Sequence, residues 1–210
     1  MRRYVFLFSV ICSFAHAEPR VVDGDTLEVD GVVYRLNGID APEHGQKCGD
    51  WECGAAATRA LAEMVDGKTV TCTALSEDGY GRVTATCSVD GADIGGAMID
   101  KGLAWAFLKY SDAYAAEELV SKDKAVGVFA GNFTPPWEFR ARRWQQAKDR
   151  ERDAPSGCVI KGNISDRGRI YHAPWSRSYD RTRINTSKGE RWFCSEAEAV
   201  AAGWRAPRWN

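Results

Sequence analysis

The chain has 210 residues, which is enough for one hydrophobic core, or for one core with a small appended module. Its formal net charge is −1, with 28 basic and 29 acidic residues, so the chain as a whole is neither strongly basic nor strongly acidic. After residue 17 it contains no long apolar run, and we therefore expect a soluble mature protein without a membrane span.

The first 17 residues have the pattern of an export signal. Arg2 and Arg3 form a basic region, a short apolar stretch follows, and Ala15-His16-Ala17 matches a small-residue cleavage site. An apolar stretch this short spans a bilayer poorly, although an N-terminal anchor helix is the alternative. We therefore predict cleavage near Ala17 and a periplasmic or secreted protein.

After the export signal, the pattern predicts short strands and helices. Residues 21–36 predict a β-hairpin, because Asp30-Gly31 is a type I′ turn signal between two β-rich stretches. In chain order the pattern then predicts a helix at 52–65, strands at 68–75 and 82–89, a helix at 93–101, a strand at 103–110 and a helix at 114–126. These elements predict a mainly β fold with helices, built on a five-stranded OB-type barrel.

Pro135-Pro136 interrupts this pattern and introduces a second part of the chain. A charged helix is predicted at 138–152, followed by a linker and a small disulfide-stapled α/β module. In that module Ser195 and Glu198 have capping-box spacing, so a helix should begin there. The predicted division is a signal at 1–17, an OB-type domain at 18–135, a charged helix and linker at 136–157, and the module at 158–210.

Charge is distributed unevenly between these parts. Residues 18–157 carry 16 basic and 24 acidic groups, a net charge of −8. Residues 158–210 carry 10 basic and 5 acidic groups, a net charge of +5. A polyanion would therefore be attracted to the second part and to local patches of the first.

Six cysteines follow the export signal, and an even number in an exported chain predicts three disulfides. Cys72 and Cys87 are symmetric about the Gly79–Tyr80 bond, so they should face each other across a hairpin at bridging distance. The other two pairs, assigned by proximity and by elimination, are Cys48–Cys53 and Cys158–Cys194.

The C-terminal module allows alternative interpretations. His172 could join Cys158 and Cys194 around zinc, but a fourth ligand and paired cysteine spacing are missing, so a disulfide is favoured. The arginines of the module are interleaved with aromatic residues. They could bind nucleic acid by stacking and phosphate contacts, or the aromatic side chains could form the small core beneath a solvated arginine face.

Carboxylates in the first part are candidates for metal binding and catalysis. Asp25 and Asp40 lie at opposite ends of paired strands, so the fold can bring them together. Two such ligands, with a backbone carbonyl and water, suit Ca²⁺, which would stabilise charge developing on a phosphate. Glu43 follows Pro42, which stiffens the loop and could direct the carboxylate at a water molecule.

Two arginines on separate hairpins complete this set. Arg35 and Arg82 could hold one phosphate from two sides and bind it more tightly as charge develops. Taken singly, these residues are unremarkable, since Asp-Gly pairs form turns and a lone strand arginine is usually solvated. Their combination predicts metal-assisted hydrolysis of a phosphodiester without a catalytic histidine, serine or cysteine.

The order of these motifs resembles the staphylococcal nuclease (thermonuclease) family. The resemblance rests on DGDT at 23–26, RLNGIDAPE at 35–43, YGR at 80–82 and GLA at 102–104. It covers roughly residues 21–131. The resemblance implies an OB barrel with helices, and hydrolysis of DNA and RNA that leaves 3′-phosphate ends.

The resemblance also implies roles for individual residues. The metal-binding residues would be Asp25, Asp40, Ala41 through its backbone carbonyl and, through water, Asp23. The catalytic residues would be Arg35, Glu43 and Arg82, with Glu43 as the general base or water-positioning group and the arginines on the phosphate. Tyr80 would line the nucleotide site.

Three departures from the family pattern bear on these roles. Ala41 stands where the family has threonine, which matters little if only its carbonyl binds. A family tyrosine that helps to hold the nucleotide falls near Leu108, and Phe107 or Tyr110 could substitute for it. Residues 18–137 carry 10 basic and 20 acidic groups, whereas the well-studied member is strongly basic. We infer that the charged helix and the C-terminal module supply the missing attraction for nucleic acid.

The C-terminal module resembles the sunset domain, which follows nuclease domains in some bacterial proteins. The sequence as a whole predicts an exported, monomeric, calcium-dependent nuclease that acts on DNA and/or RNA. The alternative is a non-catalytic envelope protein that binds nucleic acid or an acidic polysaccharide. Binding alone does not require a base beside a metal site, so Arg35, Glu43 and Arg82 count against this alternative.

Overall fold

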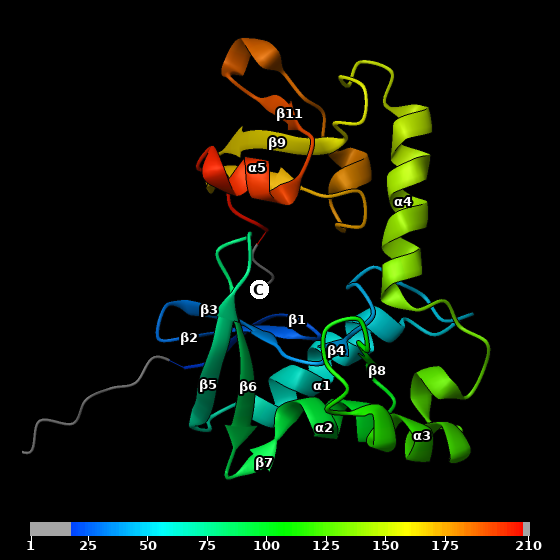
Figure 1. Ribbon diagram of the computed structural model, residues 1–210. Helices are drawn as coiled ribbons and strands as arrows, with labels where there is room; N and C mark the ends of the chain where they lie inside the picture. Colours follow the sequence, from blue (N-terminus) through cyan, green and yellow to red (C-terminus); the bar gives the residue numbers. More distant parts are fainter. Residues whose placement is uncertain (1–17, 208–210) are drawn as a thin grey trace, which may run out of the picture.

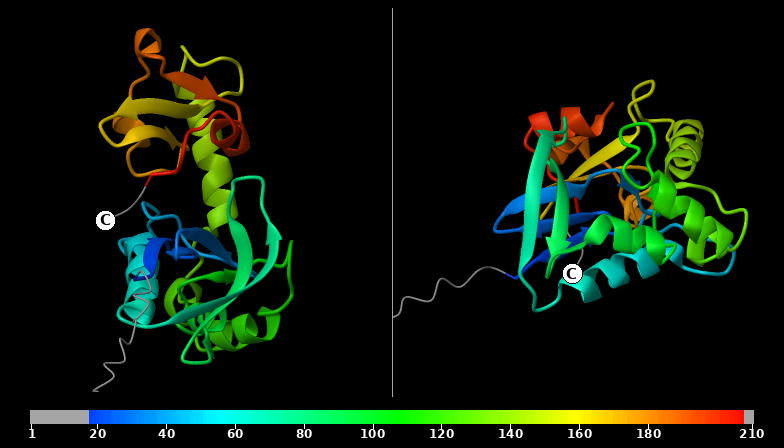
Figure 2. Two further views of the ribbon diagram at one scale, coloured as in Figure 1. Left: turned by 90° about the vertical axis from the view of Figure 1, so that its left-hand side faces the viewer. Right: turned by 60° about the horizontal axis from the view of Figure 1, so that its bottom comes forward.

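The computed structural model describes residues 18–207 (Figure 1). The predicted export signal at 1–17 and the last three residues, 208–210, lie outside this part of the chain. Within the described part, no helix is both long and apolar enough to cross a membrane. Two groups of elements, each with its own sheet and core, are joined by one long helix (Figures 1 and 2).

The first group is organised around a six-stranded sheet. Its strand order is β1-β2-β3-β6-β5, and β7 pairs with β6. The strands are β1 (Arg20–Asp23), β2 (Thr26–Val29), β3 (Val32–Leu36), β5 (Val70–Glu77), β6 (Val83–Val89) and β7 (Ala92–Asp93). The β2–β3 turn is the predicted one, because Asp30 and Gly31 both have positive φ angles, 48° and 83°, as a type I′ turn requires.

The predicted five-stranded barrel is wrong in strand number and in closure. Among the described residues the sheet has six strands, and its ladder ends at β1 and β5, which do not pair with each other. A separate antiparallel pair consists of β4 (Ile39–Asp40) and β8 (Trp105–Ala106). The strand predicted at 103–110 is only two residues long, because the chain turns at Phe107, whose carbonyl accepts hydrogen bonds from Tyr110 and Ser111.

Three helices pack against this group at the predicted places. They are α1 (Cys53–Val65), α2 (Ile94–Asp100) and α3 (Ala115–Asp123), and a short 3₁₀ helix, η1 (Gly127–Phe129), follows. The inner face of α1 carries Ala57, Leu61 and Val65, all of which are buried in the same core as Leu27 of β2. This apolar face holds the helix beside the strands that carry the candidate site.

The disulfides are the three predicted pairs. Cys72 lies directly opposite Cys87 in the β5–β6 ladder and is bonded to it. Near the turn the register is shifted by one residue, and a bulge between Ala74 and Ser76 restores the symmetric register at the two cysteines. The remaining disulfides are Cys48–Cys53 and Cys158–Cys194.

The second group is a small module with a three-stranded sheet in the order β10-β9-β11. Its elements are β9 (Ile160–Ser165), β10 (Gly168–His172), the 3₁₀ helices η2 (Tyr179–Arg181) and η3 (Thr186–Lys188), β11 (Arg191–Phe193) and α5 (Glu196–Ala201). Ser195 caps α5 as predicted, since its hydroxyl accepts a hydrogen bond from the N–H of Glu198 at 3.1 Å.

The structure bears on both questions about the module, namely zinc site or disulfide, and aromatic side chains at the surface or in the core. Cys158 and Cys194 are bonded to each other, so neither thiol is available for zinc. The ring of His172 instead lies 3.0 Å from the side-chain oxygen of Asn163. Tyr171 and Tyr179 are buried, as the core-forming interpretation expects, whereas Trp175 is half-buried.

One long helix, α4 (Pro136–Arg150), joins the two groups (Figure 1). Pro136 stands in its first turn, where a missing N–H costs no helical hydrogen bond. Its C-terminal half packs on the module through Ala147, which is buried, and Trp144. Its N-terminal half therefore projects from the module toward the first group, where it reaches the candidate site.

Candidate active site

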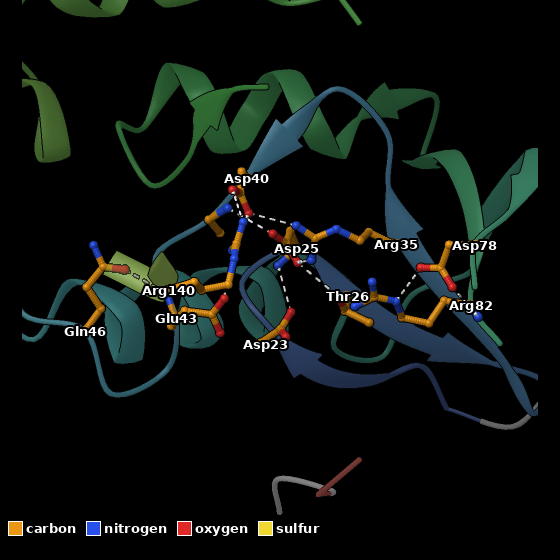
Figure 3. Close-up of polar contacts among 11 residues, drawn as sticks. Asp23, Asp25, Thr26, Arg35, Asp40, Glu43, Gln46, Asp78, Arg82 and Arg140 are labelled. Atoms are coloured by element: carbon orange, nitrogen blue, oxygen red, sulfur yellow. Dashed lines mark hydrogen bonds and ion pairs between the residues drawn. The ribbon is translucent and has the colours of Figure 1, made fainter. Parts of the chain in front are cut away.

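The two aspartates that were predicted to meet do so on either side of one guanidinium group (Figure 3). Asp25 follows β1, Asp40 lies in β4, and Arg35 lies in β3 between them in the sequence. One terminal nitrogen of Arg35 donates a hydrogen bond to Asp25, and the other donates to Asp40 at 2.8 Å. The hairpin and the following loop therefore gather three charged groups into one cluster.

Burial and neighbouring charges shift the pKa values of the aspartates in this cluster. Asp25 is 3% exposed and Asp40 is fully buried. Burial alone would raise the pKa of Asp25, but the Arg35 guanidinium and a 2.9 Å hydrogen bond from the N–H of Ala41 outweigh it, so the pKa lies below its ordinary value. The pKa of Asp23 is raised, first by burial and then by the nearby charge of Asp25.

Glu43 lies on the loop after β4 and is held there by a glutamine. The backbone N–H of Glu43 donates to the side-chain oxygen of Gln46 at 3.2 Å, and its carbonyl accepts from the N–H of Gln46 at 2.7 Å. Gln46 is 1% exposed and also donates to the carbonyl of Thr134, just before α4. Burial raises the pKa of Glu43 to about 7, and Arg140 offsets part of that rise.

We expect Gly54→Ala to displace Glu43 without altering any charged group. A Cβ at Gly54 would overlap the carbonyl group of Glu43 and would lie 3.0 Å from the carbonyl carbon of His44. Because both are backbone groups, the loop must shift, at about 1–3 kcal/mol. The free energy of unfolding should fall by that amount, and the rate of any reaction that depends on Glu43 should fall about tenfold or more, since such steps tolerate little misplacement.

The matched control for this prediction is Gly45→Ala, in the same loop. A Cβ at Gly45 would have no atom within 4 Å, and its φ angle is not positive. Urea denaturation and a cleavage assay should therefore separate the two variants. Equal behaviour of Gly54→Ala and Gly45→Ala would contradict the prediction.

Arg140 reaches the site from α4 and was missed by sequence reasoning as a site residue. Its two terminal nitrogens donate to both carboxylate oxygens of Asp40 at 3.0 and 2.7 Å, and one of them also donates to Glu43 at 2.8 Å. The sequence identified Arg140 only as one of several arginines in a charged helix. No spacing signal relates it to residues about a hundred positions earlier.

The second predicted phosphate ligand is held apart from the aspartates. Arg82 donates from Nε to Asp78 at 2.7 Å, and its guanidinium lies 5.1 Å from the centre of the Tyr80 ring. Tyr80 is 39% exposed and Tyr110 is 71% exposed. Arg35, Glu43, Arg82 and both tyrosines nevertheless line one cavity of about 1150 Å³.

The chemistry of the donors suits a divalent cation that prefers oxygen. Three carboxylates, Asp25, Asp40 and Glu43, accept hydrogen bonds from only two guanidinium groups, those of Arg35 and Arg140. The fourth carboxyl group, Asp23, accepts a hydrogen bond from the N–H of Asp25, so the cluster has more carboxyl groups than cations. Within residues 18–207, however, no three histidine, cysteine, aspartate or glutamate side chains converge into a ready-made metal site. A cation would therefore need backbone oxygen atoms and water molecules as further ligands. It would also share the carboxylate of Asp40 with Arg35 and Arg140.

Comparison with family models assigns the two parts of the chain to different families. Residues 33–126 match the family described as staphylococcal nuclease homologue, and this range contains Arg35, Asp40, Glu43 and Arg82. Residues 143–206 match a family called ArfC. The resemblance of the C-terminal module to the sunset domain stays a prediction.

Two curated relatives have names that agree with the first of these matches, and a third is named for another process. The chain is 34% identical over 158 residues to an "Uncharacterized endonuclease" of Escherichia coli, and the match covers 68% of this chain and the whole of that protein. It is 34% identical over 112 residues to "Staphylococcal-like nuclease CAN1" of Arabidopsis thaliana, covering 52% of this chain and 33% of that protein. It is also 32% identical over 117 residues to "Succinoglycan biosynthesis protein ExoI" of Rhizobium meliloti, covering 52% of this chain and 61% of that protein.

Proposed function

Because the chain belongs to the staphylococcal nuclease homologue family, we propose that it is a calcium-dependent nuclease that hydrolyses phosphodiester bonds of DNA and/or RNA. The observation that carries this proposal is the position of Arg35. Its guanidinium lies between the buried carboxylates of Asp25 and Asp40 and lines the same cavity as Glu43 and Arg82. A phosphate in that cavity would meet a base and two guanidinium groups.

In the proposed reaction, Glu43 accepts a proton from a water molecule, and the water oxygen forms a bond to phosphorus. The bond from phosphorus to the 5′-oxygen breaks, and that oxygen takes a proton from solvent, which leaves a 3′-phosphate and a 5′-hydroxyl. Arg35 and Arg82 hold the non-bridging oxygens and bind them more strongly as negative charge develops. Bound calcium would add positive charge at one of these oxygens.

The proposed metal ligands are Asp25, Asp40, the backbone carbonyl of Ala41 and, through water, Asp23. To reach a phosphate, Arg35 has to give up at least one of its two carboxylate hydrogen bonds. The excess of carboxylates in the cluster makes this exchange reasonable, because added positive charge would take over the role of the guanidinium. Tyr80 and Tyr110, both exposed at the cavity, are proposed to contact the nucleotide.

We also propose that the protein acts after export. Three disulfides within the described residues suit an oxidising compartment, such as the periplasm or the medium. The export signal itself lies in residues 1–17, outside the described part of the chain.

The test of the proposed function is digestion of plasmid DNA and of RNA by the mature protein. Cleavage should occur with calcium, stop when EGTA removes it, and resume when calcium is restored. Product ends should become extendable by a polymerase only after phosphatase treatment, since a 3′-phosphate blocks extension. Intact plasmid and RNA at all calcium concentrations would reject the proposal.

One observation favours a second candidate function, namely the similarity to the protein named for succinoglycan biosynthesis. By this alternative the chain would bind an acidic polysaccharide, or nucleic acid, without hydrolysing it. The same digestion separates the two candidates, because a binding protein would retard the nucleic acid on a gel and leave its length unchanged.

A further inference from the structure

The catalytic cavity lies between the two groups of elements. The candidate site lines it with Arg35, Glu43 and Arg82, and the C-terminal module lines it with Trp175 and Val200. In the view of Figure 1 the module lies above the first group. The residues matched to the staphylococcal nuclease homologue family, 33–126, contribute the candidate site and the β5–β6 hairpin to this cavity, and they do not include the module. The module thus covers one side of the site, which the nuclease-family part of the chain would leave exposed to solvent.

The cavity is also bounded on two sides. On one side α4 connects the two groups and presents Arg140 and Trp144 to the cavity. On the other side the β5–β6 hairpin rises from the first group until its tip meets α5 of the module (Figures 1 and 2). A Cβ placed at Gly79 lies 3.9 Å from the Cβ of Ala197, and one placed at Gly81 lies 3.8 Å from Val200. The two groups, α4 and this tip contact therefore form a ring around the cavity.

The walls of this ring are rich in aromatic side chains. Trp144 and Trp175 stand with ring centres 6.2 Å apart and planes inclined by 34°. Phe107, just after β8, is stacked on Trp137 of α4, with ring centres 5.5 Å apart and planes inclined by 14°. All four rings line the cavity that contains the catalytic cluster. Aromatic rings beside guanidinium groups are the chemistry that binds unpaired nucleotides, whose bases stack on the rings while phosphates meet the charges.

The volume of the cavity limits what it can hold. The cavity of about 1150 Å³ is only slightly larger than typical small-molecule sites, which are roughly 300–1,000 Å³. A duplex, whose major groove alone is about 12 Å wide, needs more room than a cavity of this kind offers. A few unpaired nucleotides, by contrast, fit within it.

We propose that this ring is a passage for one unpaired strand of nucleic acid, which threads past the catalytic cluster and stacks bases on Trp175 and Trp144. This inference rests on the proposed nuclease function and specifies its substrate. A strand with a free end enters by threading. A duplex or a circular strand enters only when the contact between the hairpin tip and α5 opens.

The tip contact is suited to opening. The α5 side chains beside the tip glycines are Ala197 and Val200, and within residues 18–207 no hydrogen bond or ion pair joins the tip residues 78–82 to α5. Van der Waals contacts between so few atoms contribute little free energy. The passage is therefore closed by a weak contact on this side and by a continuous helix on the other.

A disulfide across the tip contact tests the proposal. Gly79→Cys with Ala197→Cys places the two Cβ atoms about 3.9 Å apart, within the range of a disulfide, and Gly79 has no positive φ angle that would strain a cysteine. Gly79→Ser with Ala197→Ser is the matched control that cannot cross-link. Mass spectrometry without reductant verifies the bond. The substrates are one single-stranded oligonucleotide in linear and in covalently circular form.

The cross-linked protein should cleave the linear strand as the serine control does and should lose cleavage of the circle, which cannot thread a covalently closed ring. Cleavage of the circle by the cross-linked protein would overturn the proposal. So would loss of cleavage of both strands, because the tip would then have to open for every substrate. If even the wild type cleaves nothing, the nuclease function fails separately, and binding of the labelled linear and circular strands in EGTA still tests the passage.

A second variant tests the stacking surface. Trp175→Ala should raise the KM for a linear unpaired strand about tenfold with kcat unchanged, the loss expected for one base stack. Trp175→Phe should recover most of this loss, because it keeps an aromatic face. An unchanged KM in Trp175→Ala would show that bases do not stack on this residue.

Discussion

Replacing Glu43 with glutamine is expected to lower the rate of phosphodiester cleavage by roughly 10²–10⁴-fold, the usual contribution of a general base. The amide is close to the carboxylate in shape but cannot accept a proton from water. The backbone hydrogen bonds between Glu43 and Gln46 do not involve the changed atoms, so the loop should keep its position. Rates are best measured in single turnovers with saturating protein and an end-labelled oligonucleotide.

The matched control for this prediction is Glu52→Gln. Glu52 is an exposed carboxylate a few residues further along the chain, where it pairs with Lys47 at the surface. Its replacement should leave the rate within a few-fold of the wild type, since exposed ion pairs contribute little. A full rate in Glu43→Gln, with calcium present, would remove Glu43 from the proposed mechanism.

The second large effect is expected from Arg140→Ala in calcium-free protein. This change removes both hydrogen bonds that Arg140 donates to Asp40, whose carboxylate is fully buried, and the one it donates to Glu43. Removing one partner of a buried ion pair usually costs about 3–5 kcal/mol, because the other charge is left uncompensated. We expect about 3 kcal/mol here, at the low end, because Arg35 keeps one hydrogen bond to Asp40.

Calcium provides an internal check on this prediction. If the cluster binds calcium, the cation compensates Asp40 and Glu43 in place of Arg140, and part of the lost stability should return. Urea denaturation with EGTA and then with calcium measures both free energies of unfolding. The control is Arg142→Ala, which changes an exposed arginine on the same helix. Equal stability of the two variants in EGTA would show that Arg140 does not stabilise the carboxylate cluster.

Local features of this protein could be predicted because short stretches of chain determine them. Asp30-Gly31 forms its turn because both residues tolerate positive φ, and Ser195 caps α5 because its hydroxyl reaches an N–H three residues later. Cys72 and Cys87 face each other because a hairpin pairs residues at equal distances from its turn. The meeting of Asp25, Arg35 and Asp40 likewise followed from one hairpin and the loop after it.

The tertiary structure alone decided which distant groups complete the cavity. Arg140 binds Asp40 across a hundred residues, Gln46 links the Glu43 loop to Thr134, and Trp175 faces the cluster from the module. The sequence could not reveal these contacts, because they depend on the angle at which α4 leaves the first group and on the packing of the module along it. Likewise, the strand predicted at 103–110 is only two residues long, because it pairs with the two residues of β4 and the chain then turns at Phe107. Spacing along the chain therefore determined how Asp25, Arg35 and Asp40 come together, whereas packing between separate parts of the chain decided what surrounds them.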